Sequence, residues 1–555
     1  MFTIRRILIL IFLFISFSAT AADYYIVPGG TGNGSDWTNA ADIPDGWSGQ
    51  TYCSSSGAVW TRGTTYWVAG SDTPYSYGFC IRLTSGDEAG YITIKKANAT
   101  DNSGVAGWSA DYGTKQAVIP RVIMSQSATV NNVIIDGVTG SGTSGYGFKF
   151  NAENVDPIIA IGESGRRPSG VTISNVEISP SSVIGSYSAI GGYCSIVDAT
   201  TDSPNLMIQN NYIHDVGALG IHTTSSSWIT IQDNILERTG QYNNATHKEI
   251  IKHDGGSNIT IRRNILRDWQ GYSITGGIVL SCDATAGVSY ANIYNNLMYY
   301  TDADYTGKTG GNRAIGGLAS CGALNLDYIN IYNNTFYGIS ESGASNILPD
   351  FTGNTISNSE VKNNLFYNCA GLSAIGMTGV TKDYNWFYQT DNYTDRQAHD
   401  VSGSADPFTN SSTYDFTLNS STTAINKGDD LSASFTTDYL GNARPTGALT
   451  WDIGSYEYGA GGVDPVDPPS TYTVTVSLSG AGGELSVSGE RSVVATESIS
   501  ITATRHNGWN GAWSGTCPNV ASCTVPDEGK TAVCSVTPTE NCTAIYTATS
   551  VPLLN

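Results

Sequence analysis

The sequence has little charge, and little positive charge in particular. Only 14% of its 555 residues are charged, and 27 Lys and Arg residues stand against 48 Asp and Glu residues, which gives a net charge of −21. Binding to nucleic acid needs a basic surface, so this balance argues against a nucleic-acid partner. A local basic groove remains compatible with it, because salt screens charges beyond about 8–10 Å.

Long apolar runs and long amphipathic helical segments are missing after the N-terminus. The N-terminus itself has Arg5 and Arg6, an apolar core over residues 7–17, and small residues from Ala19 to Ala22. This order is typical of a secretory signal peptide, and the apolar core is too short to cross a bilayer. We therefore expect a signal peptide at residues 1–22, no membrane span, and a protein that is secreted, periplasmic or held at a bacterial cell surface.

Glycine and small polar residues are abundant, and a motif of alternating apolar residues followed by Asn recurs along the chain. The 63 glycines favour short strands and turns. Clear copies of the motif are LMIQNN from Leu206 and ITIRRN from Ile259. The last Asn of successive copies falls at Asn211, Asn234, Asn264, Asn296, Asn334 and Asn364, so the differences in residue number are 23, 30, 32, 38 and 30.

A fixed corner with insertions of variable length between copies is typical of a solenoid. Alternating apolar residues place one face of each short strand inward, and coils stacked about 4.8 Å apart pair their backbones. An Asn at one corner of every coil can adopt a left-handed backbone and bond to its neighbours above and below. The pattern therefore predicts an all-β fold built as a parallel β-helix.

Two segments at the ends of this repeat region resemble a known group of proteins. WTRGTTYWVAG (Trp60–Gly70) and DIGSYEYG (Asp452–Gly459) are similar to the opening and closing segments of the secreted right-handed parallel β-helix proteins of bacteria, the pectate-lyase-like superfamily. The resemblance covers residues 23–458 and implies a right-handed parallel β-helix that acts on a carbohydrate. It does not name an activity, because this fold carries lyases, hydrolases, epimerases and adhesins.

The C-terminal part is organised differently. Residues 459–470 form a Gly/Pro-rich linker, and residues 471–555 contain alternating strand patterns that predict a small β domain. Its segments GWNGAWSG and NCTAIYTAT resemble the internalin B-repeat of bacterial surface proteins, which implies an accessory or spacer role. Trp509 and Trp513 could stack on sugars, but core positions are commoner for such residues. Two disulfides are expected among Cys517, Cys523, Cys534 and Cys542.

The charged residues gather on one rung, THKEIIKHDGGSNITIRRNILRDWQG, from Thr246 to Gly271. Its first strand should stack with the strands that precede the other Asn motifs, in the sheet whose outer face is the substrate groove of the similar proteins. His222 should flank this strand on one side and Asp283 on the other. Cys282 and Cys321 end two successive strands of the same sheet and should be adjacent, either bonded or as two buried thiols.

A polysaccharide lyase is the first functional hypothesis. Removal of the proton next to a uronate carboxyl group needs a base and a positive group or metal that neutralises the developing charge. The candidate catalytic residues are Lys252 as the base, then His222, Glu249, Asp254 and Asp283. The candidate substrate-binding residues are Lys248, His253, Arg262 and Arg313, with Arg263 as a further cation. Glu249, Asp254 and Asp283 could bind a Ca²⁺, although the sequence fixes no cofactor.

The rung EIIKHDGGSNITIRRN also resembles the corresponding rung of the alginate lyase and chondroitinase B family. That family uses a Glu-x-Glu metal pair, a Lys soon after it, and an Arg in the next rung. Glu249 matches the second Glu, but His247 stands at the first, Asp254 stands at the Lys position, and no Arg lies near Thr275. Lys252, two residues before the family's Lys position, is therefore a candidate on chemical grounds.

Two other hypotheses stay open. A glycoside hydrolase needs two carboxyl groups about 5–9.5 Å apart, and Glu249, Asp254 and Asp283 on neighbouring rungs could supply them. The paired-Asp, Gly-His-Gly and Arg-x-Lys signatures of polygalacturonases are absent from the sequence. A non-enzymatic carbohydrate-binding surface protein or adhesin is the third hypothesis. In each case the expected partner is a long, acidic polysaccharide, and the expected state is a monomer.

Overall fold

The computed structural model describes most of the chain between Ala22 and Ser550. The described residues are 22–43, 60–81, 90–124, 130–152, 157–161, 168–180, 195–199, 205–240, 248–269, 275–282, 286–301, 312–317, 325–339, 355–369, 380–390, 396–445, 451–459, 471–480, 483–485, 489–494, 499–525, 527, 530–537 and 542–550. The predicted signal peptide before Ala22 and the predicted linker after Gly459 lie outside these residues. In the described part, no helix is both long and apolar enough to cross a membrane.

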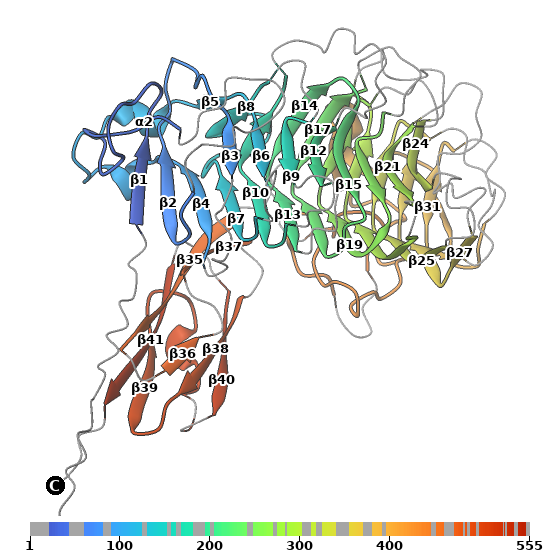
Figure 1. The fold of residues 1–555 in the computed structure, drawn as a ribbon. Helices are drawn as coiled ribbons and strands as arrows, with labels where there is room; N and C mark the ends of the chain where they lie inside the picture. The colour runs from blue at the N-terminus through green and yellow to red at the C-terminus, as the bar shows by residue number, and fades with distance from the viewer. Residues whose placement is uncertain are drawn as a thin grey trace, which may run out of the picture.

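Between Ala22 and Ser402 the described residues form a right-handed parallel β-helix, as predicted (Figure 1). Each coil contributes one strand to each of three long sheets, in a fixed order. In one coil these are β15 (Leu219–Thr224), β16 (Ile229–Gln232) and β17 (Ile235–Thr239), and the next coil repeats them as β18 (Ile251–Asp254), β19 (Gly256–Arg262) and β20 (Ile265–Arg267). Successive strands of each sheet pair in parallel.

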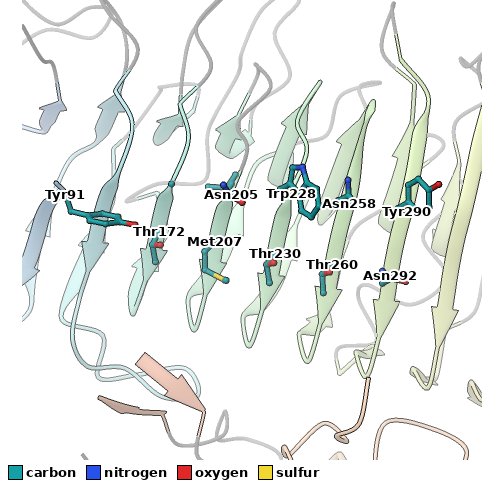
Figure 2. A pocket seen from close by; sticks show the side chains of 12 residues that line it. Tyr91, Thr172, Asn205, Met207, Trp228, Thr230, Asn258, Thr260, Tyr290 and Asn292 are labelled. Atoms are coloured by element: carbon teal, nitrogen blue, oxygen red, sulfur yellow. The ribbon is translucent and has the colours of Figure 1, made fainter. Parts of the chain in front are cut away.

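We number the sheets by their order within a coil. Among the described residues, sheet 1 has eight strands: β3 (Phe79–Ile81), β6 (Val122–Met124), β9 (Ile159–Ile161), β12 (Ser195–Ala199), β15, β18, β21 (Thr275–Ser281) and β24 (Asn312–Gly317). Sheet 2 has thirteen: β1 (Ala22–Ile26), β2 (Thr64–Val68), β4 (Ile92–Lys96), β7 (Val133–Asp136), β10 (Val171–Ser174), β13 (Leu206–Gln209), β16, β19, β22 (Val288–Tyr294), β25 (Asn325–Tyr332), β27 (Thr355–Ser357), β28 (Ser359–Lys362) and β30 (Val380–Asp383). Figure 2 shows the outer face of sheet 2, where side chains of successive strands form rows.

Sheet 3 has eleven strands in the same part of the chain: β5 (Ala117–Ile119), β8 (Phe148–Phe150), β11 (Val176–Ile178), β14 (Tyr212–Val216), β17, β20, β23 (Leu297–Tyr299), β26 (Thr335–Tyr337), β29 (Leu365–Tyr367), β31 (Trp386–Tyr388) and β32 (Val401–Ser402). Short helices α1 (Ala99–Asn102) and α2 (Ala110–Thr114) lie between β4 and β5. Apolar side chains at alternate strand positions fill the interior. In sheet 1 one such row is Ile221, Ile251, Ile278 and Ile315, all fully buried.

The corner between sheets 2 and 3 carries the predicted row of asparagines. The Asn264 backbone N–H and Nδ2 both donate to Oδ1 of Asn296 at 3.0 Å, and Asn264 Nδ2 also donates to the Ile231 carbonyl at 2.9 Å. The same bonds link Asn211 to Asn234 and continue to Asn385, which the sequence pattern did not single out. We call this row the asparagine ladder; it satisfies backbone groups that the corner would otherwise bury unpaired.

One detail of the predicted corner needs correction. The left-handed residue is the one before each ladder asparagine, not the ladder asparagine itself. Asp233 has φ 56°, Arg263 φ 51° and Asn295 φ 54°. The positive φ turns the chain, and the following Asn then points its amide along the helix axis.

Residues 401–459 run back along the coils. The hairpin β33 (Phe408–Asn410) and β34 (Asp415–Leu418) packs its phenylalanines against tyrosines of sheet 3, with the Phe416 and Tyr299 rings 4.8 Å apart. Further on, the Arg444 guanidinium donates to Oδ1 of Asn295 at 2.9 Å. This segment therefore covers sheet 3 and the ladder corner in the last coils.

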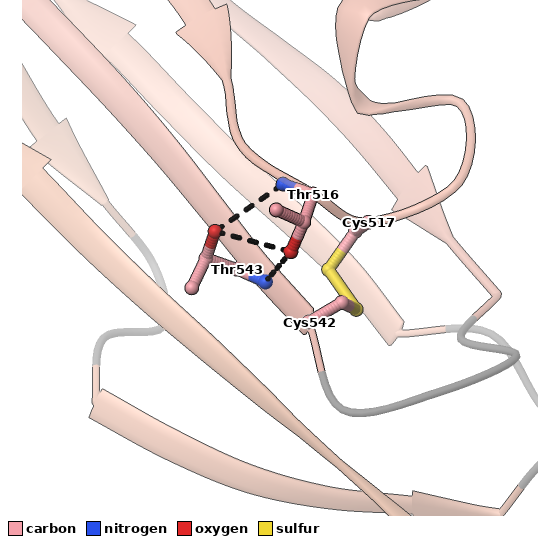
Figure 3. The surroundings of a disulfide bond; sticks show 4 residues. All are labelled: Thr516, Cys517, Cys542 and Thr543. Atoms are coloured by element: carbon pink, nitrogen blue, oxygen red, sulfur yellow. Dashed lines mark hydrogen bonds between the residues drawn. A yellow bond between two sulfur atoms is a disulfide. The ribbon is translucent and has the colours of Figure 1, made fainter.

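The C-terminal residues 471–550 form a small β domain of two sheets. One sheet has the order β37 (Gly489–Val494), β35 (Thr471–Ser479), β41 (Cys542–Ser550) and β39 (Trp509–Ser514); the other has β36 (Gly483–Leu485), β38 (Ile499–Arg505) and β40 (Thr531–Val536). The two expected disulfides pair Cys517 with Cys542 and Cys523 with Cys534. Figure 3 shows the first of them beside Thr516 and Thr543, whose backbone N–H groups each donate to the other's hydroxyl. Trp513 is in the core of the domain, as the commoner alternative predicted.

Candidate functional site

Sheet 1 brings the predicted residues of two coils into register. His222 of β15 pairs with Lys252 of β18, and Thr224 pairs with Asp254. In the next coil, Ser281 of β21 pairs with Asp254. Since Ile221 and Ile251 point into the core, the alternation of a strand places His222, Lys252 and Asp254 on the outer face of the sheet. The sequence had placed His222 at this position relative to Lys252, and the register agrees.

The side chains of these residues converge on one carboxylate. The Nε2 of His222 lies 2.8 Å from Oδ2 of Asp254, and Lys252 Nζ donates to the same oxygen at 2.7 Å. The Ser281 hydroxyl donates to Oδ1, and the Thr224 hydroxyl lies 3.1 Å from His222 Nε2. We call these five residues the His222 cluster. Its three ionisable residues are well covered, with 7% of the surface of His222, 5% of that of Lys252 and 9% of that of Asp254 exposed.

The electrostatics of the cluster fix its protonation. Burial alone would raise the pKa of the Asp254 carboxyl, but hydrogen bonds and positive charge from His222 and Lys252 hold this pKa well below its ordinary value. Asp254 is therefore a carboxylate at neutral pH, and a carboxylate only accepts hydrogen bonds. It follows that His222 carries its proton on Nε2, so in the neutral imidazole the basic lone pair is on Nδ1.

The structure corrects the grouping of the other residues predicted for this strand. His253 alternates with Lys252 and Asp254, faces the core and is 1% exposed; its Nδ1 lies 2.7 Å from the Thr223 hydroxyl. Lys248 and Glu249 precede β18 and are almost completely buried. The ammonium of Lys248 donates to the Gly240 carbonyl at 2.9 Å, and burial lowers its pKa to about 8. None of the three lies on the outer face with the His222 cluster.

The two candidate arginines of the same rung, Arg262 and Arg263, belong to a different part of the coil. Arg262 ends β19 in sheet 2, where its Nε donates to the amide oxygen Oε1 of Gln232 at 2.9 Å. Arg263 lies at the next corner, and its guanidinium forms a buried pair with Asp233, with Nε 2.7 Å from Oδ1 and Nη2 3.0 Å from Oδ2. Arg262 was predicted beside Lys252 because the residues are close in sequence, but the turn between sheets 1 and 2 separates them.

Several predicted positions lie partly or wholly outside the described residues. Asp283, His247 and Cys321 are outside them. Arg313 is described only as a backbone position of β24, in register with Gly276 of β21. Cys282 takes part in a disulfide.

One chemistry-bearing residue of the sheet was missed in the sequence. Asp198 in β12 is the register partner of His222, so Asp198, His222 and Lys252 occupy the same position in three successive coils. The predicted strand began at Ala189 and ended before Asp198, whereas β12 runs from Ser195 to Ala199. Aligning SIVDAT with LGIHTT by their alternation would have found it.

A second ionic network lies on sheet 3, around His214 of β14. The His214 ring stacks on Tyr212 with centroids 4.0 Å apart, and its Nδ1 lies 2.5 Å from Asp215. Burial lowers the pKa of His214, but bonds to Asp215 and Glu177 outweigh it and raise the pKa above its ordinary value. Arg238 closes the network by bonding Asp215 at 2.7 Å. Each charge here has a partner, as expected of a cross-strand ion-pair network.

The predicted calcium site does not fit the described residues. Nowhere among them do three His, Cys, Asp or Glu side chains lie close enough to hold a metal ion. The oxygens of Asp254 already accept from His222, Lys252 and Ser281, and the Lys252 ammonium would repel a divalent cation. Glu249, the other described candidate, is fully buried.

Comparisons with known proteins give only distant structural likenesses. No protein-family model matches the sequence, and no curated protein matches it. Pectate lyase Pel9A is 14% identical over 79% of this chain and 96% of its own, with a TM-score of 0.28. XylC in complex with xylose is 11% identical over 79% and 99%, with a TM-score of 0.39. The PL6 family alginate lyase AlyGC is 12% identical over 76% and 59%, with a TM-score of 0.29. These values are too low to carry an activity or a substrate to this chain.

Proposed function

We propose that this chain is a secreted polysaccharide-degrading enzyme that cleaves a long acidic polysaccharide by β-elimination on the outer face of sheet 1. The observation that carries the proposal is that the imidazole of His222 and the ammonium of Lys252 both bond to the single carboxylate of Asp254, at 2.8 and 2.7 Å. An oriented imidazole beside a fixed ammonium is what proton removal next to a carboxyl group requires.

His222 is the base in this proposal. With Nε2–H bonded to Asp254, the lone pair on Nδ1 takes the proton from the carbon next to the uronate carboxyl group. The electron pair of that C–H bond forms a carbon–carbon double bond. The glycosidic C–O bond breaks with its electron pair on the leaving oxygen, which takes a proton from water. Asp254 orients the imidazole and stabilises the imidazolium that forms.

Lys252 has a different role from the one expected from the sequence. Its ammonium is ion-paired with Asp254, and an ammonium has no lone pair with which to act as a base. Its positive charge instead offsets the negative charge that develops on the substrate carboxylate during proton removal. The polymer lies along the stacked strands of sheet 1, so that successive sugars meet successive coils.

The hydrolase alternative has less support. A hydrolase needs one carboxyl group that holds a proton and donates it to the leaving oxygen. Asp254 is unsuited to that role because its pKa is held well below the ordinary value. The small C-terminal domain is proposed as an accessory module, because its tryptophan Trp513 is a core residue and its surface carries no described catalytic cluster.

The proposal is tested by incubating the full chain with alginate, polygalacturonate, chondroitin sulfate and neutral xylan. We expect ultraviolet absorbance of an unsaturated uronate product with at least one acidic polymer and none with xylan. New reducing ends without that absorbance would show a hydrolase. Retention of the protein on a polysaccharide column without any cleavage would favour the adhesin.

A further inference from the structure

One corner of the β-helix, between sheets 1 and 2, holds a left-handed residue in successive coils. This residue directly precedes a buried residue of the sheet 2 strand, and it lies just before the strand in most coils and within it in β19, β22 and β25. In most coils it is Asn or Gly, which tolerate a positive φ: Asn132, Gly170, Asn205, Asn258 and Asn358 have φ between 48° and 66°. In three coils it is an aromatic residue instead, with φ 60° at Trp228, 55° at Tyr290 and 54° at Tyr328.

Bulky aromatic residues rarely adopt this backbone, so their presence needs a reason other than the turn. They are also among the most exposed large apolar side chains of the described residues, at 59% for Trp228, 51% for Tyr290 and 39% for Tyr328. The rings of Tyr290 and Tyr328 stack with centroids 4.7 Å apart and an interplanar angle of 8°. The three coils therefore accept an unfavourable backbone and exposed aromatic surface at the same position.

The rings of Trp228 and Tyr290 border a shallow groove on the outer face of sheet 2 (Figure 2). The groove has a volume of about 500 Å³, which is in the range of small-molecule sites. Rows of short polar side chains form its floor, among them Thr172, Thr230, Thr260 and Asn292, and Trp228 and Tyr290 stand at its rim. None of the residues that line it is charged, although the chain carries a net charge of −21.

We propose that this groove is a non-catalytic binding site for an uncharged stretch of polysaccharide, lying along the helix axis. Sugar rings have apolar C–H faces that stack on aromatic rings and hydroxyl groups that bond to Thr and Asn side chains. Trp228 and Tyr290 are two coils apart, about 10 Å at the usual spacing of paired strands, so two stacked sugars of one chain can meet both rings. An acidic polymer or a basic partner would find no opposite charge here.

The site is distinct from the His222 cluster, which lies on sheet 1, and the inference does not depend on the proposed elimination. A polymer held on sheet 2 would keep the protein on an insoluble or mixed glycan while sheet 1 acts. Binding on sheet 2 and cleavage on sheet 1 can therefore be lost independently of each other.

The test is a binding titration of the full chain with xylohexaose, cellohexaose, mannohexaose and laminarihexaose, followed by calorimetry and tryptophan fluorescence. We expect at least one neutral hexaose to bind, and the affinity to fall about tenfold in Trp228→Asn and in Tyr290→Asn. Both variants carry the residue that neighbouring coils use at this position. They should therefore fold with an unchanged or higher melting temperature, so that a loss of affinity does not reflect unfolding.

Tyr458→Asn is the matched control, because Tyr458 is 47% exposed but belongs to the segment that covers the last coils. It should bind like the unmodified chain, and so should His222→Gln. Failure of all four hexaoses to bind would overturn the proposal, and so would Trp228→Asn and Tyr290→Asn variants that bind as tightly as the unmodified chain. So would a self-association in sedimentation experiments that Trp228→Asn abolishes, because the occupant would then be a second copy of the chain.

Discussion

The imidazole of His222 lies 2.8 Å from the carboxylate of Asp254, although 32 residues separate them. The contact exists because one turn of the β-helix brings the two strands into register and because both side chains face outward. A change at either residue therefore tests the proposed chemistry directly.

Replacing His222 with Gln should remove the base and leave the fold intact, because Gln can still donate to Asp254. We expect kcat/KM on the acidic polymer to fall roughly 10²–10⁴-fold with little change in KM. The control is His506→Gln, since His506 is a well-exposed histidine of the C-terminal domain. Full activity of His222→Gln would remove His222 from the mechanism.

Replacing Asp254 with Asn should abolish activity and also destabilise the fold. It leaves Lys252, whose side chain is 6% exposed, without its carboxylate partner, and breaking such a buried pair costs about 3–5 kcal/mol. The double variant Asp254→Asn/Lys252→Met removes both charges, so urea denaturation should show most of that stability restored while activity stays absent. If the double variant were no more stable than Asp254→Asn, the ion pair would not be the source of the loss.

Acid should destabilise the β-helix through carboxylates whose pKa the fold depresses. Burial of Glu177 opposes ionisation, but bonds from His214, Lys149 and Gln116 lower its pKa to about 2, and the pKa of Asp254 is also lowered. A depressed pKa adds stability above the unfolded value, about 4, and this stability is lost as the pH falls through the folded value. The free energy of unfolding should therefore drop between about pH 5 and pH 2. Glu177→Gln should flatten that dependence; an unchanged slope would contradict the assignment.

Asn264→Ala should cost more stability than a surface asparagine. It removes the bonds from Nδ2 to Asn296 and to the Ile231 carbonyl, and it takes away the acceptor of the Asn234 backbone N–H and Nδ2. Buried groups left unpaired cost about 1–3 kcal/mol each, so a loss of roughly 3 kcal/mol in denaturant titrations is expected. Asn33→Ala, at an exposed residue, should change the free energy of unfolding by less than about 0.5 kcal/mol.

The double variant Cys517→Ser/Cys542→Ser should weaken only the C-terminal domain. The disulfide closes a segment of 25 residues, and loops of this size contribute about 3 kcal/mol by restricting the unfolded chain. Calorimetry should show a lower transition temperature for this domain and an unchanged transition for the β-helix. Cys369→Ser, at a buried thiol of the β-helix, should instead lower the transition temperature of the β-helix and leave that of the C-terminal domain unchanged.

The fold was predictable because its signal is repeated. Each coil restates the alternation of apolar residues and the corner asparagine, so an ambiguity in one coil is resolved by the next. The partnership of His222 with Lys252 followed from that register. The inward position of His253 was also implied, because a residue two positions after the interior Ile251 faces the same way.

Other features depend on information that alternation does not hold. Arg262 stands close to Lys252 in sequence, yet a turn places it on another sheet, and the chain length between strands does not reveal where the turn falls. The choice of His222 over Lys252 as the base rests on which side chains reach the Asp254 carboxylate. Asp198 was missed because the end of its strand was misplaced, and strand ends are the least certain part of a pattern.

The asparagine ladder keeps the same bond lengths of 2.9–3.1 Å although 21 to 38 residues separate its neighbouring members. The surplus residues of each coil must therefore be accommodated at its other corners. Evolution can lengthen or replace a loop there without disturbing the stacking of the coils. For protein engineering, these same corners are the places where a foreign recognition loop could be grafted onto an unchanged scaffold.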